Sequence, residues 1–354
     1  MPTAIVSGAL ANKPRNSGNA WTRLSWVRGL QRLGYEVFFV EQIHNPGTEH
    51  LDYFRNTMAQ FNLSQHSALL DENGTTLAGV PVGGVDLLFN ISGHLTCASL
   101  KHAARCRVYY DDDPGYTQFW HDGARLEGHD FHFTIGENIG TPACDIPTGK
   151  IPWRHTRTPV VLDDWPVCLT GDRGFSTVAS WRGAYGSVEY AGKRYGVKAH
   201  EFRKFIEMPQ RVSQTFEIAL NIDPGDQRDR EALVAHGWRL VAPPEDFRRY
   251  VQTSGAEFSV AQGIYVETNS GWFSDRTTRY LASGKPVLVQ DTGFRRHLPV
   301  GEGLLTFRTM AEAIAGAQEI AGNYAKHCRA ARALAERYFD SDKVIGSLLS
   351  QVGL

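Results

Sequence analysis

The sequence predicts an α/β protein made of two doubly wound domains that face a cleft. Short apolar runs ending in Gly and polar residues alternate with helical segments, first over residues 4–135 and again over 175–307. Between the two series, residues 141–175 hold five prolines and no long periodic segment, which is typical of a domain boundary. Because a buried parallel strand needs a crossover to reach its neighbour, usually a helix, each series predicts one open parallel sheet.

The first series starts with an apolar run at Ala4–Leu10, a polar loop and a helical segment at Ala20–Leu33. Apolar side chains recur on one face of that segment, and Gly34 ends it. Glu36–Glu41 is the next buried strand. Further strands of this series are expected at Val85–Ile91, Arg107–Tyr110 and Asp130–Ile135.

The second series repeats the alternation. Its expected strands are Phe175–Trp181, Phe216–Leu220, Trp238–Ala242, Glu257–Ala261, Pro286–Gln290 and Leu304–Phe307. Its expected helices are Ala199–Ile206, Gln227–His236, Glu245–Gln252 and Phe273–Ala282, with helical sequence again from Met310 to about Leu349. We therefore expect domains at residues 1–160 and 161–325. For residues 326–354, packing back on the first domain is one option.

Composition narrows the classes of partner. The 354 residues carry 37 Lys and Arg against 38 Asp and Glu, which disfavours duplex nucleic acid or an anionic membrane while leaving a local basic groove open. Five cysteines without a CxxC spacing argue against a disulfide scaffold or a zinc ribbon. No apolar run reaches the roughly 20 residues of a transmembrane helix, and the first residues lack a signal-peptide pattern. We expect a cytoplasmic protein.

The stretch from Ser270 to Gly293 carries the most specific pattern. A loop of small residues opens a helix, the Gly284-Lys-Pro286 turn follows, and a buried strand ends at Asp291. Backbone N–H groups at such a helix N-terminus favour an anion. The hydroxyls of Ser270 and Ser274 can cap the helix or donate to a phosphate.

Two segments resemble GT-B-fold glycosyltransferases. Leu281-Ala-Ser-Gly-Lys-Pro-Val287, followed by Asp291-Thr-Gly293, resembles their donor-binding half, and Asn16–Asn19 with Gly29–Val37 resembles their N-terminal half. Gly271-Trp-Phe-Ser-Asp-Arg276 also resembles a poorly characterised bacterial glycosyltransferase family. The resemblance implies two Rossmann-like domains and a nucleotide sugar as co-substrate. We expect no permanently bound cofactor and no metal ion.

The chain departs from the pattern of the best-known retaining members at two positions. Where those enzymes carry two glutamates eight residues apart, this sequence has Gly271 and Arg279. Ser274, Asp275 and Arg276 are the local replacements. The stereochemical outcome, the donor and the acceptor stay open.

We expect cationic, hydroxyl and loop residues of the second domain to contact the nucleotide sugar. The alternative for each of them is an ordinary structural role, as a helix cap, a turn residue or a surface charge. These residues are Arg182, Lys198, Ser270, Gly271, Ser274, Asp275, Arg276, Asp291 and Thr292. In the first domain, an acceptor or phosphate loop is expected at Asn16, Ser17, Gly18 and Asn19.

A catalytic base is sought where strands of the first domain end. The candidates are Asp111, Asp113, Glu137 and His94. Adjacent carboxylates repel one another, which raises a pKa toward a useful range for a base. If the strand alternation persists, Asp111 and Asp113 point away from Asp112. The same aspartates could instead cap a helix or bind a metal.

The function favoured by the sequence is sugar transfer from a nucleotide sugar to an unidentified acceptor. A sugar-nucleotide epimerase on the same fold and a non-catalytic nucleotide- or sugar-binding protein are the alternatives. The chain has no GxxxxGK[ST], GxSxG or HExxH pattern, which disfavours a P-loop kinase, an α/β-hydrolase and a zinc protease.

Overall fold

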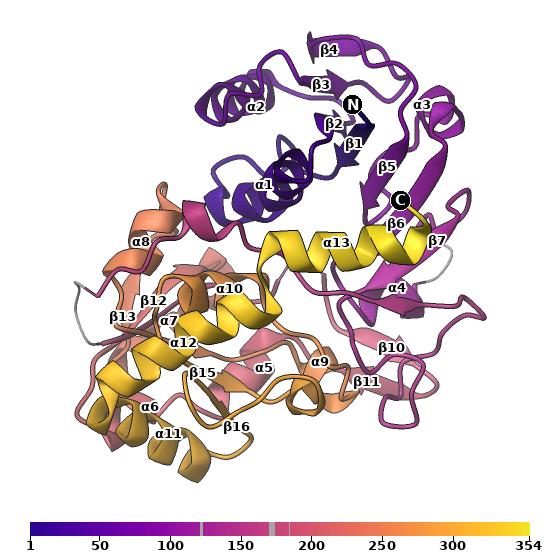
Figure 1. Ribbon diagram of the computed structural model, residues 1–354. Helices are drawn as coiled ribbons and strands as arrows, with labels where there is room; N and C mark the ends of the chain where they lie inside the picture. The colour runs from indigo at the N-terminus through magenta and orange to yellow at the C-terminus, as the bar shows by residue number, and fades with distance from the viewer. Residues whose placement is uncertain (121–122, 170–173, 184) are drawn as a thin grey trace. The chain divides into compact units, whose positions relative to one another are not determined.

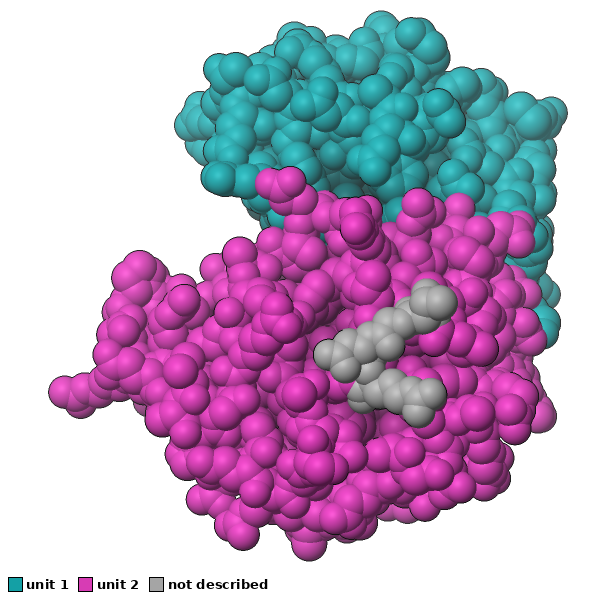
Figure 2. All heavy atoms as spheres, turned by 90° about the vertical axis from the view of Figure 1, so that its left-hand side faces the viewer, with its two compact units in different colours: residues 1–135, 147–161, 341–354 teal, residues 136–146, 162–340 magenta. Residues whose placement is uncertain are grey.

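The computed structural model of the chain describes residues 1–120, 123–169, 174–183 and 185–354, so part of the expected boundary segment, residues 170–173, lies outside it. The chain forms two compact units (Figure 2). Unit 1 comprises residues 1–135, 147–161 and 341–354, and unit 2 comprises residues 136–146 and 162–340. Each unit is built on a largely parallel sheet, which confirms the expected α/β class with two Rossmann-like domains. No helix among the described residues is long and apolar enough to span a membrane.

The sheet of unit 1 has the strand order β4-β3-β2-β1-β5-β6-β7-β8. All five predicted strands are present, as β1 (Thr3–Ser7), β2 (Glu36–Gln42), β5 (Leu87–Ile91), β6 (Cys106–Asp111) and β7 (Phe131–Thr134). Three strands that were not predicted extend the two edges, namely β3 (Ser67–Leu70), β4 (Thr76–Gly79) and β8 (Arg154–His155). Because β1 pairs in parallel with β2 on one side and with β5 on the other, the strand order reverses at β1.

Helix α1 (Ser17–Arg32) begins three residues before its apolar spacing predicts, because the Asn16 side chain caps it by accepting from Asn19 N at 3.0 Å. It packs against α13 (Ser341–Val352), where a Cβ on Gly29 would collide with Ile345 (Figure 1). The other helices of unit 1 are α2 (Thr48–Gln60), α3 (Ala98–Ala103) and α4 (Tyr116–Phe119).

Unit 2 has a six-stranded parallel sheet of order β13-β12-β9-β14-β15-β16. Its strands are the predicted ones, as β9 (Phe175–Ser180), β12 (Phe216–Asn221), β13 (Arg239–Val241), β14 (Ala256–Ser259), β15 (Val287–Gln290) and β16 (Leu304–Phe307). The order reverses between β9 and β14. An antiparallel hairpin that was not predicted follows β9, formed by β10 (Val188–Tyr190) and β11 (Lys193–Tyr195).

Four helices of unit 2 match predicted ones, namely α5 (Lys198–Arg203), α7 (Gln227–Ala235), α8 (Phe247–Thr253) and α10 (Asp275–Ala282). Two short helices are additional, α6 (Met208–Arg211) and α9 (Gly263–Glu267). The helical sequence after Met310 is divided into α11 (Met310–Gly322), α12 (Tyr324–Tyr338) and α13. Single 3-10 turns lie at η2 (Leu162–Asp164), η3 (Pro224–Asp226) and η4 (Phe294–Arg296).

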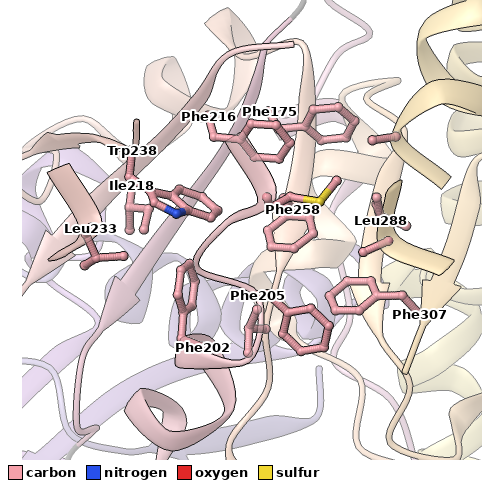
Figure 3. Close-up of a cluster of buried hydrophobic side chains, with 14 of the residues drawn as sticks. Phe175, Phe202, Phe205, Phe216, Ile218, Leu233, Trp238, Phe258, Leu288 and Phe307 are labelled. Carbon is pink, nitrogen blue, oxygen red and sulfur yellow. The ribbon is translucent and has the colours of Figure 1, made fainter. Parts of the chain in front are cut away.

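The core of unit 2 is a cluster of aromatic rings (Figure 3). Phe258 stacks on Phe307 with ring centroids 5.0 Å apart, and Phe175 stacks on Phe216 at 5.1 Å. Trp238 meets Phe216 edge-on at 5.2 Å. Four of these rings come from β9, β12, β14 and β16, and Trp238 directly precedes β13, so the cluster joins strands on both sides of the point where the strand order reverses.

Replacing Phe258 with Ala should lower the free energy of unfolding by about 3–5 kcal/mol, because the ring is fully buried and its loss leaves a cavity beside Phe307. Urea unfolding monitored by circular dichroism measures this. The matched control is Val234→Ala on α7, where the side chain is 58% exposed and a change within about 0.5 kcal/mol is expected. A similar loss in both variants would contradict a special role for the ring cluster.

Candidate functional site

A buried arginine lies where the strand order of unit 2 reverses. Strands β9 and β14 pair only at Phe175–Ala256 and Ser176–Glu257. Beyond that pairing, Arg276 from the first turn of α10 donates from Nη1 to Val178 O at 2.8 Å and from Nη2 to Ser259 Oγ at 2.6 Å. The guanidinium therefore fills the space between the two strand ends. Ligands of open parallel sheets bind at such a reversal.

The charge of Arg276 is balanced by a carboxylate beneath it. Glu257 on β14 is fully buried, and its Oε1 accepts from Arg276 Nε at 2.5 Å. The other carboxylate oxygen, Oε2, has no hydrogen-bond partner among the described residues. Removing one partner of a buried ion pair of this kind strongly destabilises the folded protein, because the other charge stays buried and unpaired. Sequence reasoning missed Glu257, although a glutamate inside the apolar run of a central strand was a visible signal.

Lys198 lies at the same edge of the sheet. It is the first residue of α5 and is 7% exposed, and its Nζ donates to Val260 O at 2.5 Å, just beyond the end of β14. Burial, and next the positive charge of Arg276, lower the pKa of Lys198 to about 7. An anion placed here would favour the charged amine. Lys198 and Arg276, both predicted donor residues, are thus brought together.

The predicted loop at 270–274 packs inside unit 2. Ser270 is fully buried and donates to Tyr265 O at 3.3 Å. Gly271 has φ +78°, and a Cβ there would lie 2.7 Å from Asn138 N, so the small residue makes room for this backbone. Ser274 is the N-cap residue of α10 without a side-chain capping bond, and Asp275 begins the helix. The ligand contacts of these residues stay a prediction.

Asp291 and Thr292 are the two residues that directly follow β15. Asp291 is buried and accepts from Gly293 N at 2.8 Å and from Arg308 at 3.0 Å, while Thr292 donates to Trp272 O. Asp291 lines a hollow of about 700 Å³ whose rim is basic, with Lys204, Arg295, Arg296 and Arg308. The volume lies within the range of small-molecule sites.

Arg182 belongs to a different set of contacts. Its Nε donates to Asp226 Oδ2 at 2.7 Å, and two thirds of its side chain is exposed. Among the described residues, no hydrogen bond or ion pair joins Arg182 to Lys198. The two predicted phosphate contacts are therefore not brought together by direct contact.

In unit 1, three consecutive aspartates end β6 in different environments. Asp111 is fully buried and accepts from the side chains of Thr117, Gln118 and Thr134 at 2.6–2.7 Å. It also accepts from Asp113 N at 3.1 Å, so its carboxylate is saturated and anchors the turn into α4. Asp112 instead forms an ion pair with Arg23 at 3.0 Å.

Asp113 is the member of this trio suited to act as a base. It is half-buried, and burial, followed by the negative charge of Asp112, raises the pKa of Asp113 to about 6. Lys13 and Arg23 oppose that rise through their positive charges. The pKa of Lys13 is itself lowered, first by burial and then by Arg23. A carboxyl with a pKa near 6 is half ionised close to working pH, which suits general-base catalysis.

Sequence reasoning missed three charged residues at this edge of unit 1, namely Lys13, Arg23 and Glu41. Glu41 on β2 is fully buried and accepts from Ala11 N at 2.6 Å and from Asn12 N at 2.9 Å, which fixes the loop before Lys13. Burial raises the pKa of Glu41 to about 7. Arg23 could have been found, because helical spacing puts it on the apolar face of α1.

His94 and Glu137 have other surroundings. Burial, and then the charge of Arg23, lower the pKa of His94 to about 3, which makes it a poor base. Glu137 belongs to unit 2, where its Oε2 lies 3.9 Å from His297 Nδ1.

The expected loop at 16–19 is the cap and first turn of α1, with Asn19 Nδ2 donating to Ala9 O at 2.7 Å. Among the described residues, no group of three or more His, Cys, Asp or Glu is placed to hold a metal ion.

Comparison with known proteins relates the chain to sugar-transferring enzymes by structure. No protein-family model and no curated protein sequence matches it. An α-glucosyltransferase solved with UDP-glucose and DNA containing an abasic site superposes with a TM-score of 0.63 at 10% identity, covering 99% of both chains. HepE from Anabaena, solved with UDP and glucose, gives 0.59 at 10% identity over 99% and 100% of the chains.

AviGT4, a glycosyltransferase of avilamycin A biosynthesis, gives a TM-score of 0.56 at 13% identity over 99% of this chain and 96% of its own. The fold is the two-domain GT-B fold. These likenesses extend over the whole chain, so they confirm the architecture implied by the resemblance of the two sequence segments. Identities of 10–13% do not carry individual residues across, and the site of this chain rests on its own geometry.

Replacing Arg276 with Met should lower the free energy of unfolding by about 3–5 kcal/mol, because Glu257 is then buried without its partner. The double variant with Glu257→Leu should recover most of that loss, since neither charge remains. Urea unfolding of the single and double variants measures the coupling.

The control for this pair is Arg239→Met, which breaks an ion pair with Glu217. Because the Arg239 side chain is 75% exposed, the free energy of unfolding should fall by only about 0–1 kcal/mol. If the double variant were as unstable as Arg276→Met alone, the ion pair would not be the source of the effect.

Proposed function

We propose that this protein is a glycosyltransferase that moves a sugar from a nucleotide-sugar donor to a hydroxyl group of an acceptor. The observation that carries the proposal is the position of Lys198 and Arg276 at the carboxyl ends of β9 and β14, where the strand order of unit 2 reverses. It is supported by a fold shared over its whole length with glycosyltransferases solved with UDP or UDP-glucose.

Unit 2 is the proposed donor unit. A leaving nucleoside diphosphate gains negative charge in the transition state, and fixed cations stabilise it. Lys198 is suited to this because its pKa is near 7, so contact with the developing charge favours the protonated amine. Ser274 and the amino end of α10 add N–H and O–H donors, and Asp275 suits a ribose or sugar hydroxyl. We assign no role in this step to a metal ion.

Unit 1 is the proposed acceptor unit, with Asp113 as the base. An acceptor hydroxyl must lose a proton as it attacks, and a carboxylate with a pKa near 6 takes it. Glu41 holds the loop before Lys13 by backbone hydrogen bonds, and Asp111 holds the turn that contains Asp113. This preformed acid–base cluster favours group transfer to an acceptor over simple ligand binding. An epimerase would also need acid–base groups, but it needs no acceptor loop.

Lys198→Met should weaken UDP binding by about tenfold or more, because a charge-assisted hydrogen bond to phosphate contributes about 1.5–3 kcal/mol. Uridine has no phosphate, so its affinity should stay unchanged. Isothermal titration with UDP and with uridine measures both. Lys326→Met on α12, whose side chain is half exposed, serves as the matched control, and Arg182→Ala tests the second predicted cation. Equal loss of both ligands would point to a folding defect and count against the assignment.

The rate of UDP release from UDP-glucose, with water as acceptor, should fall as the pH drops below about 6. The reason is the direction in which the pKa of Asp113 is shifted. Asp113 acts as a base only when ionised, and its raised pKa moves the loss of the carboxylate up from the ordinary range near 4. In Asp113→Asn the low-pH limb should vanish and kcat should fall, with UDP affinity retained. A limb that persists in Asp113→Asn and disappears in Glu41→Gln would move the base to Glu41.

A further inference from the structure

The hollow of about 700 Å³ beside the ends of β15 and β16 has a strongly polar lining, and all of its lining residues belong to unit 2. Four of them are cationic, namely Lys204, Arg295, Arg296 and Arg308. Among the described residues that line it, Val266 contributes the one apolar side chain. A hollow of this size takes a small molecule, and this lining suits a charged, hydroxylated molecule better than a lipid tail or an aromatic ring.

A buried carboxylate holds two of these cations in place. Asp291, whose side chain is 1% exposed, accepts from Gly293 N through Oδ1 at 2.8 Å and from Arg308 Nε through Oδ2 at 3.1 Å. Arg308 Nη2 lies 3.0 Å from the same Oδ2, and Arg295 Nη1 lies 3.8 Å from it. Both oxygens of Asp291 therefore have partners, while the Nη1 group of Arg308 takes part in none of these contacts.

A second buried carboxylate fixes the lysine of the rim. Glu201, whose side chain is 4% exposed, accepts from Lys204 Nζ at 2.6 Å and from Gln290 Nε2 at 2.8 Å. The Lys204 side chain itself remains 60% exposed. Because each carboxylate in the lining is paired with a cation, the repulsion that it would exert on a bound anion is reduced.

Arg296 is the cation of the rim that has no partner. Its side chain is exposed, and among the described residues it makes no hydrogen bond or ion pair. The lining therefore carries four positive side chains against the two carboxylates of Asp291 and Glu201, which leaves an excess of two positive charges. A phosphate monoester carries nearly two negative charges at neutral pH, so it matches this excess.

We propose that this hollow binds a phosphate monoester of a small polar molecule, such as a sugar phosphate. The planar guanidinium groups of Arg296 and Arg308 can each donate to two phosphate oxygens, and Lys204 adds a compact positive charge. A phosphate group alone fills a small part of the hollow, so room remains for the hydroxylated body of the molecule.

This site goes beyond the proposed function and does not depend on it. Lys198, Arg276 and Ser274, the proposed contacts of the nucleotide diphosphate, are not among the residues that line the hollow. Asp291 does line it and was also predicted to contact the donor, so the experiment must separate the two ligands.

The test is isothermal titration of the full-length protein with glucose 6-phosphate, with inorganic phosphate and glucose as comparison ligands. We expect glucose 6-phosphate to bind more tightly than inorganic phosphate, and we expect no binding of glucose, which lacks the charge. Arg296→Gln should weaken the binding of glucose 6-phosphate about tenfold or more, because a charge-assisted hydrogen bond to phosphate is lost. Saturation with UDP should leave this binding unchanged.

Arg230→Gln on α7 is the matched control. Arg230 is also exposed and, among the described residues, also makes no side-chain hydrogen bond or ion pair, so its loss should not change the binding. Because Arg296 has no partner to lose, urea unfolding should show both variants to be as stable as the unaltered protein. Absence of binding, equal or tighter binding of inorganic phosphate, equal weakening in both variants, or displacement by UDP would each overturn the proposal.

Discussion

The guanidinium of Arg276 between the ends of β9 and β14 makes the interactions on which unit 2 depends. Two neighbouring parallel strands would normally pair along their length, but a planar group with five N–H donors can satisfy the backbone of one strand and the side chains of the other. Here it bonds Val178 O, Ser259 Oγ and Glu257, so it fills the space between the two strand ends beyond their last paired residues, Ser176 and Glu257.

The same guanidinium sets the character of Lys198. A lysine that is buried beside a fixed positive charge loses part of its tendency to hold a proton, and it regains that tendency when an anion arrives. Arg276 itself stays charged, because its Glu257 partner lies beneath it and because guanidinium does not deprotonate in proteins. One cation is therefore structural and permanent, while its neighbour would gain a proton when an anion binds beside it.

In unit 1, different surroundings likewise give three adjacent carboxylates different partners and different properties. Asp111 is saturated by hydroxyl, amide and backbone donors, Asp112 is held by Arg23, and Asp113 keeps a pKa near 6 at a half-buried position. Sequence order alone treats the three as equivalent. Their roles diverge because each side chain leaves the strand end in its own direction and meets different partners.

Local patterns predicted most of the fold, and long-range contacts explain what they missed. Apolar runs marked eleven strands correctly, and most of these are central parallel strands that are buried on both faces. The edge strands β3, β4 and β8 and the hairpin β10–β11 are short and partly exposed, so their composition resembles that of loops. At the site, Lys198, Arg276 and Asp113 could be proposed from strand and helix ends. Glu41 and Glu257 act through partners 19 to 30 residues away along the chain.

Gly271 shows how one residue pattern permits two physical explanations. A small residue at the start of a helix suits a ligand phosphate, but here it gives room to the backbone of Asn138, which is distant in sequence and belongs to the same unit. Arg279, eight positions on, is fully buried and donates to Asp275 O. Arginine has no acceptor, so it cannot replace a glutamate that accepts from donor hydroxyls. Under the proposed function, hydroxyl recognition needs another acceptor, and Asp275, in the first turn of the same helix, is our candidate.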